Sequence, residues 1–192
     1  MDINAEKPDI VVITGDFVDD ESEKEDMLAS CEALGRLNAE KGIYFVWGNH
    51  DEGYFNSRNF SGEELRKNLE KNGIIILEDE ALLLPENICL VGRKDASDKE
   101  RKSISELMKD ISPDYYTIVL DHQPNDYDNE SAAGADLVLS GHTHGGHMFP
   151  AGPIGVFIGA NDEYYGLHTR ENTSFIVSSG VSAWEIPFKT GT

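Results

Sequence analysis

The clearest feature of the hydrophobic pattern is a pair of continuous apolar runs separated by an amphipathic segment. The first run covers residues 8–14 and leads into Asp16, and the second is Ile43–Trp47. Both are rich in β-branched or aromatic residues, as expected for strands buried on both faces. Between them, apolar residues at helical spacing from Met27 to Leu37 predict a helix that ends near Gly42. A strand, a helix and a strand in this order predict a layered α/β domain.

The rest of the chain continues the alternation of helices and strands. Ser61 and Glu64 have the spacing of a capping box, and they predict the start of a helix that ends at Gly73. Helical spacing also predicts a helix from Ile104 to Ile111. The other short apolar runs predict strands, the first three of them antiparallel: Ile74–Leu77, Ala81–Leu84, Ile88–Val91, Tyr116–Leu120, Ala135–Leu139, Ile154–Ile158, Tyr164–Leu167 and Phe175–Val177. All of these elements fit a single domain over residues 1–192.

The composition argues against some classes of function. The chain has 16 Lys and Arg against 36 Asp and Glu, a net charge of −20, and such a surface repels nucleic-acid phosphates. We therefore expect no nucleic-acid partner and attribute the acidity to solubility. Cys31 and Cys89 lack metal or redox spacing, so we expect two core thiols in a reducing compartment. No apolar run approaches the ~20 residues that span a bilayer, and we expect a cytoplasmic chain without a membrane segment.

Metal-capable side chains follow four of the predicted strands. They are Asp16, Asn49, His122 and His142. In open α/β sheets, ligands bind beyond the carboxyl ends of the strands, so side chains that follow different strands can meet at one point. A carboxylate, an amide oxygen and two imidazoles suit Mn, Fe, Zn, Ni or Co better than Ca or Mg. The pattern therefore predicts a divalent metal site at this edge of the sheet.

The segment from Ser140 to His147 contains further histidines. In an extended segment, residues i and i+2 share a face, so His142 and His144 are expected to point the same way. The neighbouring glycines let the backbone approach other groups closely. The alternative is a polar surface turn that happens to contain histidine. His147 is either part of a substrate pocket or a solvated turn residue.

These residues together carry a resemblance to a known family. Four motifs occur in the order that is typical of calcineurin-like metallophosphoesterases: Gly15-Asp16, Gly48-Asn49-His50-Asp51, His122 and Gly141-His142-Thr143-His144. The continuation into Gly145-Gly146 is similar to the bacterial branch of YkuE-like and UDP-2,3-diacylglucosamine hydrolase-like proteins. The resemblance implies a four-layer αββα sandwich, in which two mixed sheets pack face to face and helices flank them.

The resemblance also implies a role for each metal ligand. Asp16 would bridge two ions, because an anion between dications about 3.5–4 Å apart relieves their repulsion. Asn49, His122 and His142 would complete the shell of one ion. His144 would belong to the other ion.

The adjacent residues His50 and Asp51 are the implied catalytic pair. His50 would stabilise phosphoryl oxygens or protonate the leaving group, and Asp51 would orient the His50 ring. The alternative is a pair that only stabilises the turn.

One motif of the family is missing from this chain. The family begins with Asp-x-His after an earlier strand, but here no histidine precedes His50. We therefore expect a domain incomplete at its N-terminus, a sheet without a strand beside Ile10 to Ile13, and one firmly held ion in place of two. A longer natural N-terminus could carry a membrane anchor.

The predicted function is metal-dependent hydrolysis of a phosphoester by activated water. Phosphodiesters or pyrophosphate-linked substrates, either small or lipid-linked, are favoured over monoesters. The alternative is a non-catalytic scaffold that keeps a partial metal site. The missing Asp-x-His favours the scaffold, whereas the His50-Asp51 pair favours the enzyme. A structural zinc site fits poorly, because Asn49 would be an unusual structural ligand.

Overall fold

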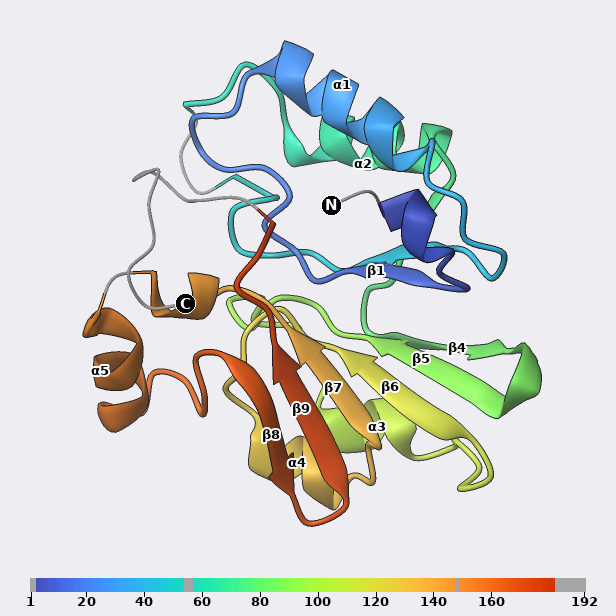
Figure 1. Cartoon of the computed structure of the whole chain (residues 1–192), viewed down its shortest axis with the longest axis vertical. Coiled ribbons are helices and arrows are strands. Elements are labelled where there is room, and N and C mark those ends of the chain that lie inside the picture. Colours follow the sequence, from blue (N-terminus) through green and yellow to red (C-terminus); the bar gives the residue numbers. More distant parts are fainter. Residues whose placement is uncertain (1–2, 54–56, 148, 182–192) are drawn as a thin grey trace.

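A computed structural model describes residues 3–53, 57–147 and 149–181. Two β-sheets pack face to face, and helices lie on their outer faces (Figure 1). The predicted four-layer αββα sandwich is therefore confirmed as the fold class.

The smaller sheet has three parallel strands in the order β1 (Val11–Ile13), β2 (Ile43–Phe45) and β3 (Ile74–Ile76). Helix α1 (Lys24–Leu34) connects β1 to β2, and α2 (Gly62–Lys71) connects β2 to β3. A helical crossover brings the chain back to the same end of the sheet, and this makes neighbouring strands parallel. The prediction that both sheets are mixed, and that Ile74–Leu77 is antiparallel to the next runs, is therefore wrong for this sheet.

The larger sheet is mixed and has the strand order β4-β5-β6-β7-β9-β8. Its strands are β4 (Glu80–Leu84), β5 (Ile88–Gly92), β6 (Tyr116–Leu120), β7 (Leu137–Ser140), β8 (Gly166–Arg170) and β9 (Thr173–Val177). The antiparallel pairs β4–β5 and β8–β9 lie at its two edges. Its helices are α3 (Ile104–Met108) and α4 (Tyr127–Ala132), and short 3-10 turns occur at η1 (Ile3–Glu6), η2 (Pro85–Asn87) and η3 (His144–Gly146).

Each interface between layers has its own hydrophobic core. Successive residues of a strand point to opposite faces. On β2, Phe45 accordingly packs toward α1 and α2, whereas Tyr44 faces the other sheet. On β5, Val91 packs toward α3 and α4, whereas Leu90 meets Tyr44 in the inter-sheet core. This alternation explains why the central strands are apolar throughout.

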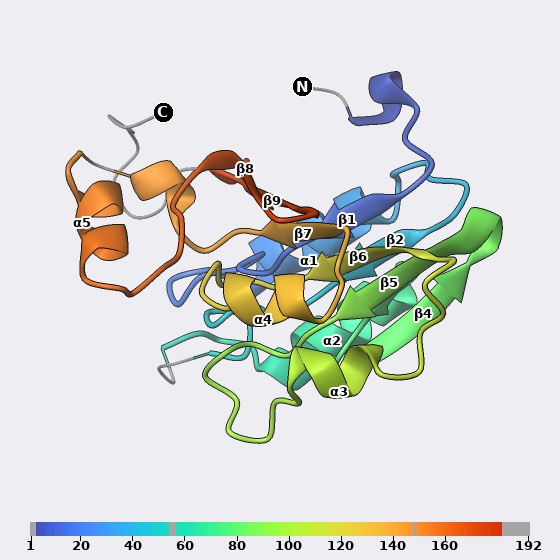
Figure 2. The same ribbon diagram turned by 90° about the horizontal axis from the view of Figure 1, so that it is seen from below.

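Three elements differ from the sequence prediction. Helix α1 ends at Leu34 and not near Gly42, and the short helix α4 was not predicted. The run Ile154–Ile158, predicted as a strand, belongs largely to helix α5 (Ala151–Phe157). Pro153 fits this helix because its first turn needs no backbone N–H donor there. Helix α5 stands at one side of the molecule, at the opposite end from β4 in both views (Figure 1 and Figure 2).

The cysteines and strand β1 agree with expectation within the described residues. Both cysteines are buried and free. In the described residues, strand β1 pairs only with β2, so it forms an edge of the smaller sheet. This agrees with the expectation that the sheet has no further strand beside Ile10 to Ile13. Across the described segments, no helix combines the length and the apolar character that crossing a membrane requires.

Candidate metal centre

The four predicted ligands of one metal come from both sheets. Asp16 and Asn49 follow β1 and β2 of the smaller sheet, and His122 and His142 follow β6 and β7 of the larger one. These four strands are parallel to their neighbours, so their carboxyl ends lie at one edge of each sheet. The packing of the two sheets brings the four loops together.

The ligand atoms converge on Nε2 of His122. This nitrogen lies 3.1 Å from Oδ2 of Asp16, 3.1 Å from Oδ1 of Asn49 and 3.2 Å from Nδ1 of His142. The candidate ligand atoms of Asp16, His122 and His142 all lie within 4.8 Å of one another. Two imidazoles, a carboxylate and an amide oxygen form a donor set that fits a divalent transition metal.

The other nitrogen of His122 supports this fit. Nδ1 lies 2.6 Å from the backbone oxygen of Thr14. A carbonyl oxygen only accepts hydrogen bonds, so Nδ1 carries the hydrogen and donates it. Nε2 of the neutral ring is then the nitrogen with a free lone pair, which is the arrangement of a metal-binding histidine.

Burial and neighbouring charges shift the pKa values of the cluster. Burial raises the pKa of Asp16, but the hydrogen bond and charge of His122 outweigh this effect and place the pKa below its usual value. Burial lowers the pKa of His122, but Asp16 and the Thr14 carbonyl outweigh it and raise the pKa. Burial and the positive charge of His122 lower the pKa of His142 to about 4. Without a metal, Asp16 therefore favours the protonated form of His122, whereas His142 favours its neutral form.

Asp51 has a different role from the predicted one. Its Oδ1 accepts hydrogen bonds from the backbone N–H groups of Phe17 and Val18, and its Oδ2 accepts from those of Asp16 and Gly48. The side chain is fully buried, and this burial raises the pKa of Asp51 to about 6 against the effect of the Gly48 N–H. Asp51 therefore joins the loop after β1 to the loop after β2, and the prediction that it orients the His50 ring is wrong.

Asp20 takes the place beside the His50 ring. Its Oδ2 lies 2.7 Å from Nδ1 of His50, whose backbone N–H donates to Oδ1 of Asp16 at 2.9 Å. Arg58 donates to the backbone oxygens of His50 at 3.0 Å and Asp51 at 2.9 Å, and so holds this loop from the other side. Sequence reasoning missed both residues, because Asp20 lies in an acidic stretch attributed to solubility and Arg58 follows no motif.

The two loops of the smaller sheet approach closely at Gly15, whose φ is +83°. A Cβ built there would meet the backbone N of Gly48, and it would lie 2.6 Å from the Cα of Gly48 and 2.8 Å from Nδ1 of His122. Real Cβ atoms do not approach so closely. Glycine is therefore required here both by the backbone conformation and by the space available.

A buried ionic cluster lies next to His122 in the chain. Nη1 of Arg93 is 2.8 Å from Asp121, 2.8 Å from Asp126 and 3.1 Å from Glu130, and Arg101 also contacts Asp121. Burial and the charge of Asp121 raise the pKa of Glu130 well above its usual value. Arg93 and Arg101 supply the positive charge that stabilises these buried carboxyl groups. Asp121 directly precedes His122, so this cluster fixes the end of β6.

His144 and His147 lie in a tight turn beside the candidate metal ligands. Both have positive φ, as has His142, so the extended geometry predicted for His142 to His144 is wrong: the strand ends at Ser140 and the chain turns. Among the described residues, the group of possible metal ligands that includes Asp16 and His122 contains His142 but not His144. The assignment of His144 to a second ion stays a prediction.

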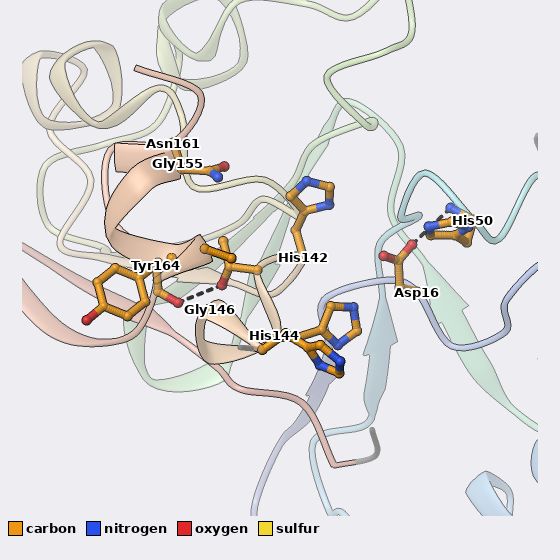
Figure 3. A pocket seen from close by; sticks show the side chains of 12 residues that line it. Asp16, His50, His142, His144, Gly146, Gly155, Asn161 and Tyr164 are labelled. Carbon is orange, nitrogen blue, oxygen red and sulfur yellow. Dashed lines mark hydrogen bonds between the residues drawn. The ribbon is translucent and has the colours of Figure 1, made fainter. Parts of the chain in front are cut away.

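A cavity of about 270 Å³ opens next to the cluster. It lies between Asp16 and His50 on one side and helix α5 on the other, with His142 and His144 pointing toward it (Figure 3). His147 also lines it, as one of its two predicted roles requires. A separate groove of about 590 Å³ runs along β1 and is also lined by Asp16, His50 and His144. The cluster is thus accessible from two sides.

Comparisons with known proteins agree on one family. Residues 2–146 match the family described as calcineurin-like phosphoesterase. An uncharacterized metallophosphoesterase from Aquifex aeolicus is 38% identical over 153 residues, which are 77% of this chain and 55% of that protein. A transmembrane protein with metallophosphoesterase domain from Bos taurus is 31% identical over 98% of this chain and 45% of its own length. YkoQ, an uncharacterized metallophosphoesterase from Bacillus subtilis, is 30% identical over 95% of this chain and 68% of its own. The chain spans about half the length of the first two of these relatives.

Proposed function

The chain belongs to the calcineurin-like phosphoesterase family, as its motifs predicted, and on this premise we propose that it hydrolyses phosphoesters with a bound divalent metal. We favour phosphodiesters or pyrophosphate-linked substrates, small or lipid-linked, over monoesters. The observation that carries the proposal is the convergence of Asp16, Asn49 and His142 within 3.2 Å of Nε2 of His122.

Four side chains are proposed to hold the ion: Asp16, Asn49, His122 and His142. A divalent ion bound there supplies positive charge for the phosphoryl oxygens and lowers the pKa of water toward about 7. Asn49 adds a ligand oxygen without adding negative charge, which keeps the site attractive to an anionic substrate. Thr14 fixes the ring of His122 through Nδ1, and Asp51 fixes the backbone that carries Asp16.

His50 is proposed to act on the substrate from the side of the cavity. It lines both the cavity and the groove, and Asp20 holds its Nδ1. The Nε2 atom of this ring is then the one that can donate a proton to a leaving oxygen or stabilise a phosphoryl oxygen. Asp20 is accordingly a positioning residue that acts through His50.

One firmly bound ion per chain is proposed, with a second site at Asp16 and His144 that is weak. The first site has four side-chain ligands from this chain, whereas the second site has only two, Asp16 and His144. Elemental analysis after dialysis is expected to find about one Mn²⁺ per chain. A transition-metal ion is held firmly where protein groups supply most of its coordination shell, and only the first site meets this condition. Two tightly retained ions would contradict this assignment.

Hydrolysis of bis-p-nitrophenyl phosphate with added Mn²⁺ tests the proposed activity. Asn49→Ala removes a ligand but no charge, so it is expected to abolish most of the rate and weaken Mn²⁺ binding. Equal, negligible rates in the wild type and in Asn49→Ala would refute catalysis by this chain and favour the scaffold.

The role of Asp20 has a matched control in the next residue. Asp20→Asn is expected to lower kcat by about 10- to 100-fold and to leave Mn²⁺ affinity unchanged, because Asp20 contacts His50 and not the ligand cluster. Glu21→Gln removes the same charge from an exposed neighbour and should leave kcat unchanged. Equal losses in both variants would show that only the overall charge matters.

A further inference from the structure

Helix α5 and its C-cap residue Ile158 expose three large apolar side chains on one side. Ile154, Phe157 and Ile158 are 51%, 90% and 69% exposed, and we call them the α5 patch. Residues at spacings of three and four share a side of a helix, so the three side chains form one surface. Such a patch is unusual on an acidic chain in which 27% of residues are charged.

The segment that carries the patch has no charged residue. From Phe149 to Asn161 the sequence has no Asp, Glu, Lys or Arg. The next acidic residues, Asp162 and Glu163, are paired with Arg170 at 3.5 Å and His168 at 3.3 Å. The segment around the patch therefore contributes no charged side chain to the polar rim that typical protein interfaces have.

Helix α5 is fixed firmly to the candidate metal centre. A Cβ on Gly152 would lie 2.5 Å from the Tyr164 ring and 2.9 Å from the Cα of Gly146, so the helix packs directly against the histidine-containing turn. Ala151, Gly152 and Gly155, on another side of the helix, line the cavity. Figure 3 shows Gly155 and Asn161 across the cavity from Asp16 and His50. Whatever binds the patch is therefore held beside the cavity.

We propose that the α5 patch docks on a membrane surface of uncharged or zwitterionic lipids. Apolar side chains at a membrane interface can be buried about 5–10 Å deep at the boundary between headgroups and acyl chains, without any specific hydrogen bond. A second copy of the chain is a weaker fit, because three side chains offer on the order of 400 Å², about half of what each partner of a stable interface buries.

The charge of the chain determines which lipids suit it. At −20, the molecule is repelled by anionic headgroups, and the patch has no lysine or arginine to compensate. Binding is therefore expected to be strongest on phosphatidylcholine, to weaken as phosphatidylglycerol is added, and to tolerate salt. The further consequence, that the cavity then meets phosphoesters whose apolar part stays in the lipid, rests on the proposed function.

Vesicle flotation of the full chain in EDTA tests the docking without metal, substrate or catalysis. The wild type is expected to float with phosphatidylcholine vesicles, and Phe157→Ser and Ile158→Ser should each reduce the partition coefficient by about tenfold. Leu83→Ser is the matched control, since Leu83 is 56% exposed on β4, at the opposite end from α5 (Figure 1). It should bind as the wild type does.

A gain-of-signal variant covers the case in which a serine variant folds poorly. The fluorescence of Phe157→Trp should shift to the blue on addition of phosphatidylcholine vesicles. Absence of flotation and of this shift, equal loss in Leu83→Ser, or binding that needs anionic lipid and disappears in salt would each overturn the proposal. So would a stable dimer that Phe157→Ser dissociates, because the patch would then belong to a second copy. Hydrolysis of bis-p-nitrophenyl phosphate by Phe157→Ser, which is expected to be unchanged, separates this proposal from the proposed activity.

Discussion

Replacement of Gly15 by alanine tests the close approach of the two loops on which the candidate metal centre depends. The new methyl group would be placed against the backbone N of Gly48 and 2.8 Å from Nδ1 of His122. It would also force alanine into a backbone conformation with φ near +83°. Gly134→Ala is the matched control, because Gly134 has a φ of +87° and nothing within 4 Å of a built Cβ.

Both variants place alanine in a left-handed backbone conformation, but only Gly15→Ala also forces a methyl group into a packed site. The left-handed conformation costs a residue with a Cβ about 1–2 kcal/mol in both variants. The effect of alanine on the unfolded chain is also the same in both, so it cancels. Gly15→Ala adds about 1–3 kcal/mol for forcing a methyl group into a packed site. We therefore expect a loss of about 2–5 kcal/mol in the free energy of unfolding for Gly15→Ala, against about 1–2 kcal/mol for Gly134→Ala.

Urea unfolding measures the stability difference, and titration with Mn²⁺ measures its effect on the site. Because the methyl group displaces Gly48 or His122, Gly15→Ala should weaken Mn²⁺ binding by about 10- to 100-fold, the range found when groups that orient metal ligands are changed. Gly134→Ala should bind Mn²⁺ as the wild type does. If both variants unfold at the same urea concentration and bind Mn²⁺ equally well, the loops do not approach as described and the geometry of the cluster is wrong.

Three further predictions concern the pH dependence, the buried ions and the helix cap. The pKa of His122 is raised, so this ring keeps its proton to higher pH than usual, and Mn²⁺ must displace that proton. Calorimetry should therefore show that Mn²⁺ affinity rises with pH until His122 is neutral. An affinity that does not depend on pH would contradict the assignment of His122 as a ligand. In the metal-free protein, the raised pKa of His122 also stabilises the folded state. This contribution to the free energy of unfolding is fully present below the pKa of an unfolded histidine, about 6.5, and is lost as the pH rises through the pKa of His122 in the folded state. Arg93→Met leaves buried carboxylates uncompensated and should lower the unfolding free energy by about 3–5 kcal/mol in urea titrations, and a loss below about 1 kcal/mol would mean that the cluster is solvated. Ser61→Ala should cost about 1 kcal/mol in the same assay, because it removes the acceptor for the N–H of Glu64, and an unchanged midpoint would show that the capping box does not contribute.

The convergence of the four candidate ligands was predictable, because their positions follow from strand topology. Asp16, Asn49, His122 and His142 each follow a short apolar run, and the β-branched and aromatic residues of these runs favour buried strands over helices. Parallel strands bring their carboxyl ends to one edge of a sheet, and the packing of the two sheets then brings both edges together. The family and the fold class follow from the same motifs, and both are confirmed.

The contacts of His50 were not predictable in this way. Asp20 reaches its ring only through the path of the loop between β1 and α1, and no periodic pattern records such a path. Asp51 is adjacent to His50 in sequence, yet its carboxylate turns to the backbone of residues 16–18 and 48. Buried N–H groups need acceptors, and this need decided the orientation of Asp51.

Local pattern was also insufficient for two apolar runs. Ile154–Ile158 has too few residues for periodicity to separate a strand from a helix, and the packing of Gly152 against Gly146 and Tyr164 belongs to tertiary structure. Ile74–Ile76 has the same local character as β4 and β5, but it pairs with β2 because α2 returns the chain to the smaller sheet. In both cases long-range contacts decided between alternatives that the sequence left equal.

The division of the four proposed ligands between two sheets has a consequence for folding. Each sheet brings two of them, and the sheets also pack together through the core around Tyr44, Leu77 and Leu90. An ion that needs all four groups recognises only the assembled sandwich, so cation uptake and sheet docking are thermodynamically linked. Substitutions at Leu90, which is not one of the proposed ligands, should then alter metal affinity, since they change how often the two halves are docked.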